Sequence, residues 1–412
     1  MFIYNSVLGS DGVTKEKRTY NNGYTSKDKP FWMALIALAA ASIMTFSNIY
    51  MLQPILPIFT REFDVSPTAS SLLISLTIVS LIIGLLVFGL MSDRWGRVKL
   101  MKVTMLLSII PLFIMPFVES FALLLVLRFI QGFFVAGLPA AAIAYIGEEF
   151  EQRSVRIGIS FYIASNAVGG MFGRVFVGYI SEYASWQMSL WLLFVLEALF
   201  FIAFLILLPA SRNFHTSELP IKDDLAGMFI HLKNKNLIPA FYMGIVIQLT
   251  FTGVWTYLPF YLSDAPFYLS IGTITFAYFA YGLGLVSSPV ASKLSLSFGM
   301  GKIVITSVFV MLTGILLTAI PVVVLIYLGV GLMCLGFFVV HSMVAASVNQ
   351  TATHHKGGAS SIYLVSYYIG VATGGTLTGF LWGAIGWLGV IALAVLLIPG
   401  VLWGRQTYLR TV

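Results

Sequence analysis

Apolar and polar residues alternate in long blocks along this chain. Runs of about twenty mostly apolar residues are separated by short polar segments. A helix of that length crosses the ~30 Å hydrocarbon core of a bilayer. The pattern predicts twelve membrane-spanning helices, at about 31–58, 67–91, 100–118, 121–147, 157–180, 186–208, 237–262, 267–291, 301–320, 322–347, 357–381 and 385–404.

The polar segments divide these spans into two equal groups. A polar tail covers residues 1–30, the longest loop covers 209–236, and a short tail covers 405–412. Six predicted spans therefore fall in a first bundle, 31–208, and six in a second, 237–404. Both termini lie on the same side of the membrane, because the number of spans is even. The first apolar run is too long for the core of a signal peptide.

Lysine and arginine gather on one side of the predicted membrane. If the N-terminus is cytoplasmic, the cytoplasmic tails and loops hold 20 of the 23 Lys and Arg residues. Of the other three, Arg61 lies in an opposite loop, and Arg128 and Arg174 lie within spans. Membrane proteins carry such an excess of positive charge in their cytoplasmic loops. We therefore expect a multi-pass protein of a bacterial plasma (inner) membrane with both termini in the cytoplasm.

The composition excludes a soluble protein. The 412 residues are 59% apolar and only 9% charged, whereas a soluble domain carries about 25% charged residues. The basic residues beside the spans explain the net charge of +7, so no nucleic-acid partner is expected. The single cysteine, Cys334, excludes a disulfide framework or a thiolate metal cluster within one chain.

Common catalytic sequence patterns are missing. There is no Walker-type phosphate loop, so ATP is not expected to drive transport, and a proton gradient is the remaining energy source. The nucleophile elbow of hydrolases and the H-E-x-x-H zinc pattern are also absent. We expect neither an enzyme nor a bound cofactor; a membrane enzyme or a non-transporting receptor would require polar catalytic clusters or extended loops.

Short motifs recur between the two halves at a nearly constant spacing. Three matches occur in order: Trp95-Gly96 with Phe298-Gly299 at 203 positions, Gly132 to Val135 with Gly336 to Val339 at 204, and Gly169-Gly170 with Gly374-Gly375 at 205. They indicate a duplicated six-helix unit. In transporters built this way, substrate binds near the midplane between two halves that rock about it. A duplicated scaffold without transport is the alternative.

Three motifs carry a family resemblance. Residues 89–100 read Gly-Leu-Met-Ser-Asp-Arg-Trp-Gly-Arg-Val-Lys-Leu, and residues 124–132 read Leu-x-x-x-Arg-x-x-Gln-Gly. Both are similar to signature motifs of the major facilitator superfamily. Residues 167–174, Ala-Val-Gly-Gly-Met-Phe-Gly-Arg, resemble a variant of its glycine-rich antiporter motif. The resemblance implies an all-α membrane fold with twelve transmembrane helices in two pseudo-symmetric six-helix bundles.

A narrower resemblance rests on about fifty residues. The Gly-Gly-x-x-Gly-Arg form is followed by Ser185-Trp186 and by Leu-Pro-x-Ser-Arg at 208–212. This arrangement resembles the YnfM-like branch of twelve-helix drug:proton antiporters, which is associated with acriflavine and drug resistance. The resemblance implies export of drug-like compounds.

The loop Gly89–Lys99 is a candidate gate. Its glycines, Gly89 and Gly96, allow tight turning, and the carboxylate of Asp93 can face the positive N-terminal end of a helix. The resemblance implies that this helix is the span beginning near 357, so that Asp93 latches the halves shut on the cytoplasmic side. Arg97 then needs an acidic partner, for which Glu148 and Glu149 are the candidates.

Simple anchoring is the alternative role for this loop. Arg94, Arg97 and the nearby lysines are basic residues at a cytoplasmic membrane surface. Anchoring explains neither Asp93 nor the placement of the glycines. In the copy of the loop at 292–302 the charged positions have become Leu, Ser and Met, so a latch there is expected to be weaker.

Two arginines and two other titratable residues lie within predicted spans. Arg128, which shares a helix face with Gln131, is a candidate for proton coupling or substrate contact, because a charge inside a span faces the bundle interior or a partner. Arg174 is a candidate for gating or ligand contact, and snorkelling to the outer surface is the alternative for both. Glu197 and His341 are candidate proton carriers, with structural packing as the alternative.

Small residues and polar aromatic residues complete the set of candidates. Glycines at which helices are expected to approach closely are Gly132, Gly169, Gly170, Gly173, Gly374 and Gly375. Residues expected to line a central cavity are Asn48, Gln53, Gln248, Trp255, Tyr281, Tyr367 and Tyr368. An aromatic wall with scattered hydrogen-bonding groups suits bulky, partly apolar ligands.

Together these features predict a monomeric secondary active transporter that works by alternating access. The preferred substrates are small hydrophobic or drug-like compounds, exported in exchange for protons. A specific transporter of a small metabolite or organic anion is the alternative. One departure favours that alternative: many cation-exporting antiporters keep a carboxylate in the first span, and 31–58 has none.

Overall fold

The computed structural model describes residues 23–214, 216, 230–352 and 356–409. Every regular element in these residues is a helix, apart from an isolated bridge between Tyr24 and Phe150. Most of the predicted N-terminal tail, much of the predicted central loop and the last three residues of the predicted C-terminal tail lie outside the described part. The predicted all-α architecture is confirmed.

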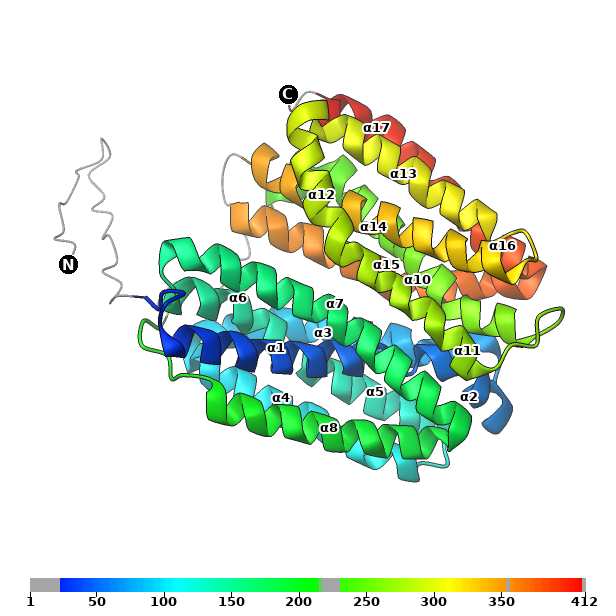
Figure 1. The fold of residues 1–412 in the computed structure, drawn as a ribbon, viewed down its shortest axis with the longest axis horizontal. Coiled ribbons are helices and arrows are strands. Elements are labelled where there is room, and N and C mark those ends of the chain that lie inside the picture. The colour runs from blue at the N-terminus through cyan, green and yellow to red at the C-terminus, as the bar shows by residue number, and fades with distance from the viewer. Residues whose placement is uncertain (1–22, 215, 217–229, 353–355, 410–412) are drawn as a thin grey trace.

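The helices form two groups that follow the order of the chain (Figure 1). The first group contains α1 (Lys29–Tyr50), η1 (Gln53–Ile55), α2 (Leu56–Glu62), α3 (Pro67–Trp95), α4 (Arg97–Ile114), η2 (Met115–Phe117), α5 (Phe121–Val135), α6 (Gly137–Glu149), α7 (Gln152–Tyr183) and α8 (Trp186–Leu207). The second contains η3 (Ile230–Lys233), α10 (Ile238–Ser263), α11 (Ile271–Thr275), η4 (Phe276–Tyr281), α12 (Gly282–Phe298), α13 (Met300–Leu317), α14 (Val323–Thr351), α15 (Lys356–Ile385), α16 (Trp387–Ala392), η5 (Leu393–Leu396) and α17 (Leu397–Leu409).

Ten helical segments in the described residues are long and apolar enough to cross a membrane. The other two predicted spans correspond to α7 and to the shorter apolar segment Trp387–Trp403. Although α7 has 32 residues, polar and small side chains such as Ser165, Gly169 and Arg174 are buried along it. Its polar face is therefore covered by protein, which is how a helix of this kind lies in a membrane.

Prolines explain three breaks in the predicted spans. A proline lacks the N–H group for the helical ladder, and its ring clashes with the carbonyl four residues earlier. The span that begins with α1 is interrupted after Tyr50, just before Pro54. Pro139 follows the α5–α6 break at Ala136, and Pro399 follows the 3₁₀ segment η5.

Glycines let α1 pack on α7, and α10 on α15, at equivalent places in the two halves. A Cβ atom added to Gly169 would lie 2.7 Å from the Cα atom of Ile43. In the second half, a Cβ atom on Gly374 would lie 2.7 Å from the carbonyl oxygen of Leu249. Only glycine permits such close helix contacts. The equivalence agrees with the duplication read from the sequence.

The other candidate contact glycines lie in different surroundings. A Cβ atom on Gly132 would lie 2.1 Å from the Thr77 carbonyl oxygen, so this glycine joins α5 closely to α3. Gly173 meets α1 at Ser47. Gly170 lies within α7 beside Arg174, whose Nη1 atom would be 3.3 Å from an added Cβ atom, and Gly375 faces α3 of the other half.

The turns α3–α4 and α12–α13 share an unusual backbone shape. Gly96 has a φ of 94° and Gly299 a φ of 82°. Residues with a Cβ atom rarely adopt such values, so glycine is favoured at both turns. These two glycines are also paired by the sequence repeat.

The two halves are joined at the end of the molecule opposite the Gly89–Lys99 loop. We call this the far end, and the end that carries the loop the loop end. In Figure 1 the short helix α11 of the second half lies beside α7 there, and it also contacts η1. Hydrogen bonds cross between the halves from Gln53 Nε2 to Thr256 Oγ1 (3.0 Å), from Thr376 Oγ1 to Ser75 Oγ (3.1 Å) and from the Gly272 N–H to Glu182 Oε2 (3.4 Å).

The α1–α7 contact predicts a clear effect of a single methyl group. Gly169→Ala should lower the free energy of unfolding by about 1–3 kcal/mol, because the added Cβ atom forces two helix backbones apart. Gly147→Ala in α6 is the matched control, since nothing lies within 4 Å of its added Cβ atom. Thermal unfolding of the purified proteins in detergent measures both. Equal melting temperatures for the two variants would contradict the close contact.

Candidate functional site

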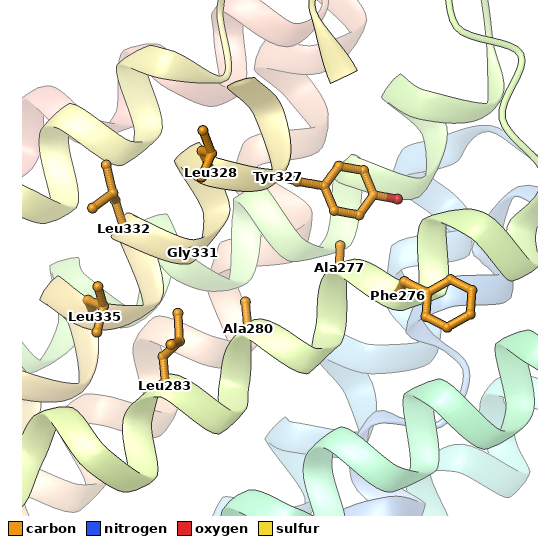
Figure 2. A pocket seen from close by; sticks show the side chains of 9 residues that line it. All are labelled: Phe276, Ala277, Ala280, Leu283, Tyr327, Leu328, Gly331, Leu332 and Leu335. Atoms are coloured by element: carbon orange, nitrogen blue, oxygen red, sulfur yellow. The ribbon is translucent and has the colours of Figure 1, made fainter. Parts of the chain in front are cut away.

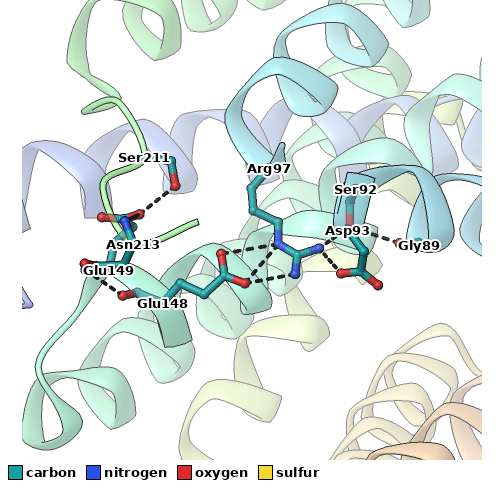
Figure 3. Close-up of polar contacts among 8 residues, drawn as sticks. All are labelled: Gly89, Ser92, Asp93, Arg97, Glu148, Glu149, Ser211 and Asn213. Carbon is teal, nitrogen blue, oxygen red and sulfur yellow. Dashed lines mark hydrogen bonds and ion pairs between the residues drawn. The ribbon is translucent and has the colours of Figure 1, made fainter. Parts of the chain in front are cut away.

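Arg97 ties together three helix ends at the loop end (Figure 3). It is the first residue of α4 and follows the turn at Gly96. Its Nη1 atom donates to Asp93 and, at 2.5 Å, to Ser92 Oγ. Its Nη2 atom lies 2.9 Å from Glu148 Oε1 at the end of α6. Of the two acids considered from the sequence, Glu148 is the partner of Arg97.

Glu149 holds a different segment. Its Oε1 atom accepts hydrogen bonds from Ser211 Oγ (2.6 Å), the Arg212 N–H (2.7 Å) and the Asn213 N–H (3.0 Å). These residues follow α8 and overlap the Leu-Pro-x-Ser-Arg motif. The motif therefore fastens the end of α8 to the end of α6, beside the Arg97 cluster.

The gate residues at the loop end face solvent or their own half. The Asp93 side chain is 41% exposed, and its ion-pair partner is Arg97 of the same half. Arg94 is exposed, and nothing lies within 4 Å of a Cβ atom on Gly89. The side chains at the start of α15 lie outside the described residues, so the contact of Asp93 with that helix stays a prediction.

Arg128 is buried inside the first half. Its guanidinium donates to the carbonyl oxygens of Asn48 (2.7 Å) and Ile49 (2.8 Å) in the last turn of α1, and to that of Leu73 in α3 (3.0 Å). It also donates to Gln131 Oε1 at 2.5 Å. The carbonyls of a last helical turn lack helical partners and carry partial negative charge. Arg128 therefore caps α1 where that helix breaks.

Glu197 belongs to the same network. Asn48 Nδ2 donates to Glu197 Oε2 at 2.6 Å, and the Asn48 side-chain oxygen accepts from Gln131. Glu197 and Asn48 are both fully buried. The structure thus brings Asn48, Arg128, Gln131 and Glu197 into one cluster, which we call the Arg128 network. The Asn48 side chain, in the last turns of α1, is directed toward Gln131 of α5 and Glu197 of α8.

Arg174 lies where the two halves meet. Its Nε atom donates to Gln53 Oε1 (2.7 Å) and its Nη1 atom to the Gly170 carbonyl (2.6 Å). The guanidinium carbon lies 4.1 Å from the ring centroid of Tyr50, 4.5 Å from that of Tyr281 and 5.4 Å from that of Tyr278. Tyr278 and Tyr281 belong to η4 of the second half.

Gln53 extends this group across the interface. Its oxygen accepts from Arg174 and its Nε2 atom donates to Thr256 of the second half. We call Tyr50, Gln53, Arg174, Thr256, Tyr278 and Tyr281 the interface cluster. Tyr50 and Thr256 were not among the candidates predicted from the sequence. No local sequence signal marks either residue, because the groups that they contact lie on other helices.

Trp255 packs on the interface cluster, and the remaining candidates of the second half lie on α10, α14 and α15. Trp255 is fully buried and stacks on Tyr278, with ring centroids 4.7 Å apart. His341 Nδ1 lies 3.0 Å from the Tyr363 hydroxyl, and the His341 ring lies 4.6 Å from that of Tyr367. Gln248, on α10, donates to Thr252 at 3.2 Å.

Tyr367 and its neighbour Tyr368 lie at the border between the halves. Tyr367 packs against the apolar cores of both halves, and Tyr368 is buried among residues of the first.

An apolar pocket of about 340 Å³ lies outside the interface cluster, between η4, α12 and α14 (Figure 2). It is lined by Phe276, Ala277, Ala280, Leu283, Tyr327, Leu328, Gly331, Leu332 and Leu335. The Tyr327 hydroxyl, its one side-chain polar group, donates to the Thr273 carbonyl at 2.8 Å. Phe276 and Leu328 are exposed, so the pocket opens on an apolar outer face of the bundle.

Two similar groups of membrane-length helices, joined through buried polar groups, define a helical membrane transporter. A sequence model described as "Major Facilitator Superfamily" matches residues 38–268. The chain belongs to the major facilitator superfamily and is not an enzyme. In the described residues, no group of three or more His, Cys, Asp or Glu side chains is placed to hold a metal ion.

Curated relatives match the chain over nearly its whole length. The MFS-type transporter YybF of Bacillus subtilis is 34% identical over 92% of this chain and 94% of the relative. The inner membrane transport protein YnfM of Escherichia coli is 31% identical over 98% of both chains. The YnfM resemblance read from the motifs is confirmed.

Solved structures share the fold. One is a bacterial homologue of the human lysosomal transporter Spinster, in an inward-facing and unoccupied conformation. It has a TM-score of 0.76 at 14% identity and covers 94% of this chain and 99% of that one. Another, a mutant of the nucleoside transporter NupG, has a TM-score of 0.72 at 13% identity and covers 92% and 98%. The predicted major facilitator fold is confirmed.

The capping role of Arg128 predicts that its positive charge alone is insufficient. Arg128→Lys keeps the charge but cannot reach four separate acceptors, so the first half should lose at least about 3 kcal/mol of stability. Thermal unfolding in detergent measures the loss. Arg156→Lys, at an exposed position of α7, is the control. A lysine variant at 128 that melts with the wild type would contradict the capping role.

Proposed function

We propose that this chain is a secondary active transporter that exports small, partly apolar, drug-like compounds in exchange for protons. The observation that carries the proposal is an asymmetry between the two ends. Hydrogen bonds join the halves at the far end, whereas Asp93 at the loop end is 41% exposed in its side chain and pairs within its own half. Alternating access requires such a difference between the ends.

In this proposal the loop end faces the cytoplasm of a bacterial cell, and the described state is inward-facing. The excess of Lys and Arg on that side supports this orientation. The Spinster homologue of similar fold is also inward-facing. The transporter acts as a monomer in the inner membrane, and the far-end contacts break when the halves rock outward.

Asp93 is the residue that makes and breaks the proposed contact between the halves at the loop end. When the halves close at the loop end, its carboxylate meets the N-terminal end of α15, where the helix dipole is positive. Arg97 stays attached to Glu148 at 2.9 Å and keeps the end of α3 aligned. The second half has Leu296 at the position of Asp93, and this leucine is 89% exposed. One charged latch in the first half therefore controls the gate.

Glu197 is the proposed proton carrier. Its Oε2 atom accepts from Asn48, and its Oε1 atom has no hydrogen-bond partner among the described residues. Protonation of Glu197 changes the hydrogen bond that the Asn48 side chain makes to it. The backbone carbonyl of the same Asn48 accepts from Arg128 near the end of α1. Gln53, just beyond that break, joins the two halves. The proposed proton site is thereby linked to the far-end contact through residues 48–53. His341 is the alternative proton carrier.

The substrate preference rests on two features. Tyrosine and tryptophan rings around the interface cluster suit bulky, partly apolar molecules. The motif resemblance to the drug-resistance branch favours export. Transport of an organic anion or a small metabolite is the second candidate function, and the buried Arg174 favours it.

Transport by inverted membrane vesicles tests the function and the proton carrier together. Wild-type vesicles with an acid interior should accumulate a fluorescent drug-like compound, and a protonophore should abolish this. Glu197→Gln should reduce gradient-driven accumulation at least about tenfold, because an amide cannot carry the proton. Exchange of substrate without a gradient should remain. Glu119→Gln, at an exposed position, is the control. Normal gradient dependence in the Glu197 variant would exclude that carboxyl as the carrier.

The latch predicts a separate defect. Asp93→Asn should insert normally, bind substrate with unchanged affinity and turn over several-fold more slowly, because the amide lacks the charge that meets the helix dipole. The measurements are initial rates at saturating substrate and equilibrium binding to the same preparation. Asp64→Asn, an exposed acid at the far end, is the matched control. A wild-type turnover rate for Asp93→Asn would remove the gate from the proposal.

A further inference from the structure

Arg174 is a buried cation without a carboxylate partner. The arginine is only 2% exposed, and its hydrogen-bond acceptors are an amide oxygen and a backbone carbonyl. The ion pairs in the described part of the chain belong to Arg97 instead. A cation shielded from water is costly unless an opposite charge compensates it.

The acids nearest in sequence or in the bundle are engaged elsewhere. Glu182, two turns further along α7, accepts from the backbone N–H of Gly272 at 3.4 Å. Glu197 accepts from Asn48 in the Arg128 network. The guanidinium of Arg174 donates through Nε and Nη1 to protein groups in the described residues, which leaves the Nη2 donors for another acceptor. Within the described ranges, the groups that contact it are neutral dipoles and ring faces.

The surroundings of Arg174 define what kind of anion fits. The rings of Tyr50 and Tyr281 lie on the guanidinium, and both tyrosines are buried, with 9% of each exposed. Tyrosine faces contact flat apolar groups well. A guanidinium is the side chain best suited to bind a carboxylate through two parallel hydrogen bonds.

We propose that Arg174 binds the carboxylate of an aromatic organic anion, whose ring packs against Tyr50 and Tyr281. The inference rests on the second candidate function, transport of an organic anion, and names the substrate class of the central site. In the absence of such an anion, the Gln53 side-chain oxygen accepts from Arg174 Nε at 2.7 Å. A carboxylate that takes this donor frees Gln53, which also bonds Thr256 of the other half.

Substrate binding therefore competes with the link between the halves. When the anion binds, Gln53 loses its strongest acceptor interaction, because a charged acceptor outcompetes an amide for a guanidinium. The Gln53–Thr256 bond then loses the alignment that Arg174 provides. Binding of the anion at Arg174 thus favours separation of the two halves at the far end.

Equilibrium binding to the purified protein in detergent tests the inference without any gradient. Three probes share one body and differ in charge: radiolabelled 1-naphthoate, 1-naphthamide and 1-naphthylmethylammonium. The wild type should bind naphthoate at least about tenfold more tightly than the other two. Arg174→Gln should abolish this preference while the amide still binds.

A second variant separates recognition from folding. Gln53→Glu places a resident carboxylate of nearly the same shape beside Arg174. It should keep the wild-type melting temperature or raise it, and lower naphthoate affinity at least about tenfold. Gln152→Glu, at an exposed position at the start of α7 and outside the interface cluster, should leave naphthoate binding unchanged.

Different outcomes contradict the anion site and the proposed transport function. Preference for the ammonium probe, binding of none of the three, or a naphthoate preference that survives both Arg174→Gln and Gln53→Glu overturns the anion site. Charge-selective binding without gradient-driven movement in vesicles leaves the anion site standing and overturns the proposed transport function.

Discussion

A charge buried in a membrane-spanning bundle must find inside the protein the solvation that water would otherwise supply. Arg128 finds it in the carbonyls of a helix end, which exist as free acceptors only because α1 breaks before Pro54. The arginine and the break therefore depend on each other: without the break the charge lacks acceptors, and without the charge the broken turn lacks donors. Gln53 and the far-end contact between the halves follow directly after that break.

The three arginines discussed above solve the same problem in different ways. Arg97, at a helix end near the surface, has two carboxylates. Arg128 is satisfied by three backbone carbonyls and one amide. Arg174 is held by neutral groups and ring faces from both halves. The degree of compensation falls toward the interface between the halves, where Arg174 has no carboxylate partner among the described residues.

The fold was largely predictable from the sequence, and the site only in part. Apolar runs, basic loops and repeated motifs are local patterns, so they locate the helices and relate Gly96 to Gly299. The partner of Arg97 could be narrowed to Glu148 or Glu149 because a short loop and one helix end contain the charges, and the structure selects Glu148. The surroundings of Arg128 and the side-chain bonds of Asn48 could not be predicted, because the free carbonyls at the α1 break and the partners on other helices depend on tertiary structure. Tyr50 was missed for the same reason: nothing in its own segment reveals a cation above its ring.

The polar face of α7 also bears on how the protein is made. A helix that buries serine, glycine and arginine along one side gains little from lipid when it leaves the translocon alone. It gains much more if α1 is already in the bilayer, because the surface of Ile43 and Ser47 is shaped to receive its glycines. Packing thus imposes an order on the biogenesis of the first half: α1 must be in the membrane before α7, the fifth predicted span, emerges from the ribosome.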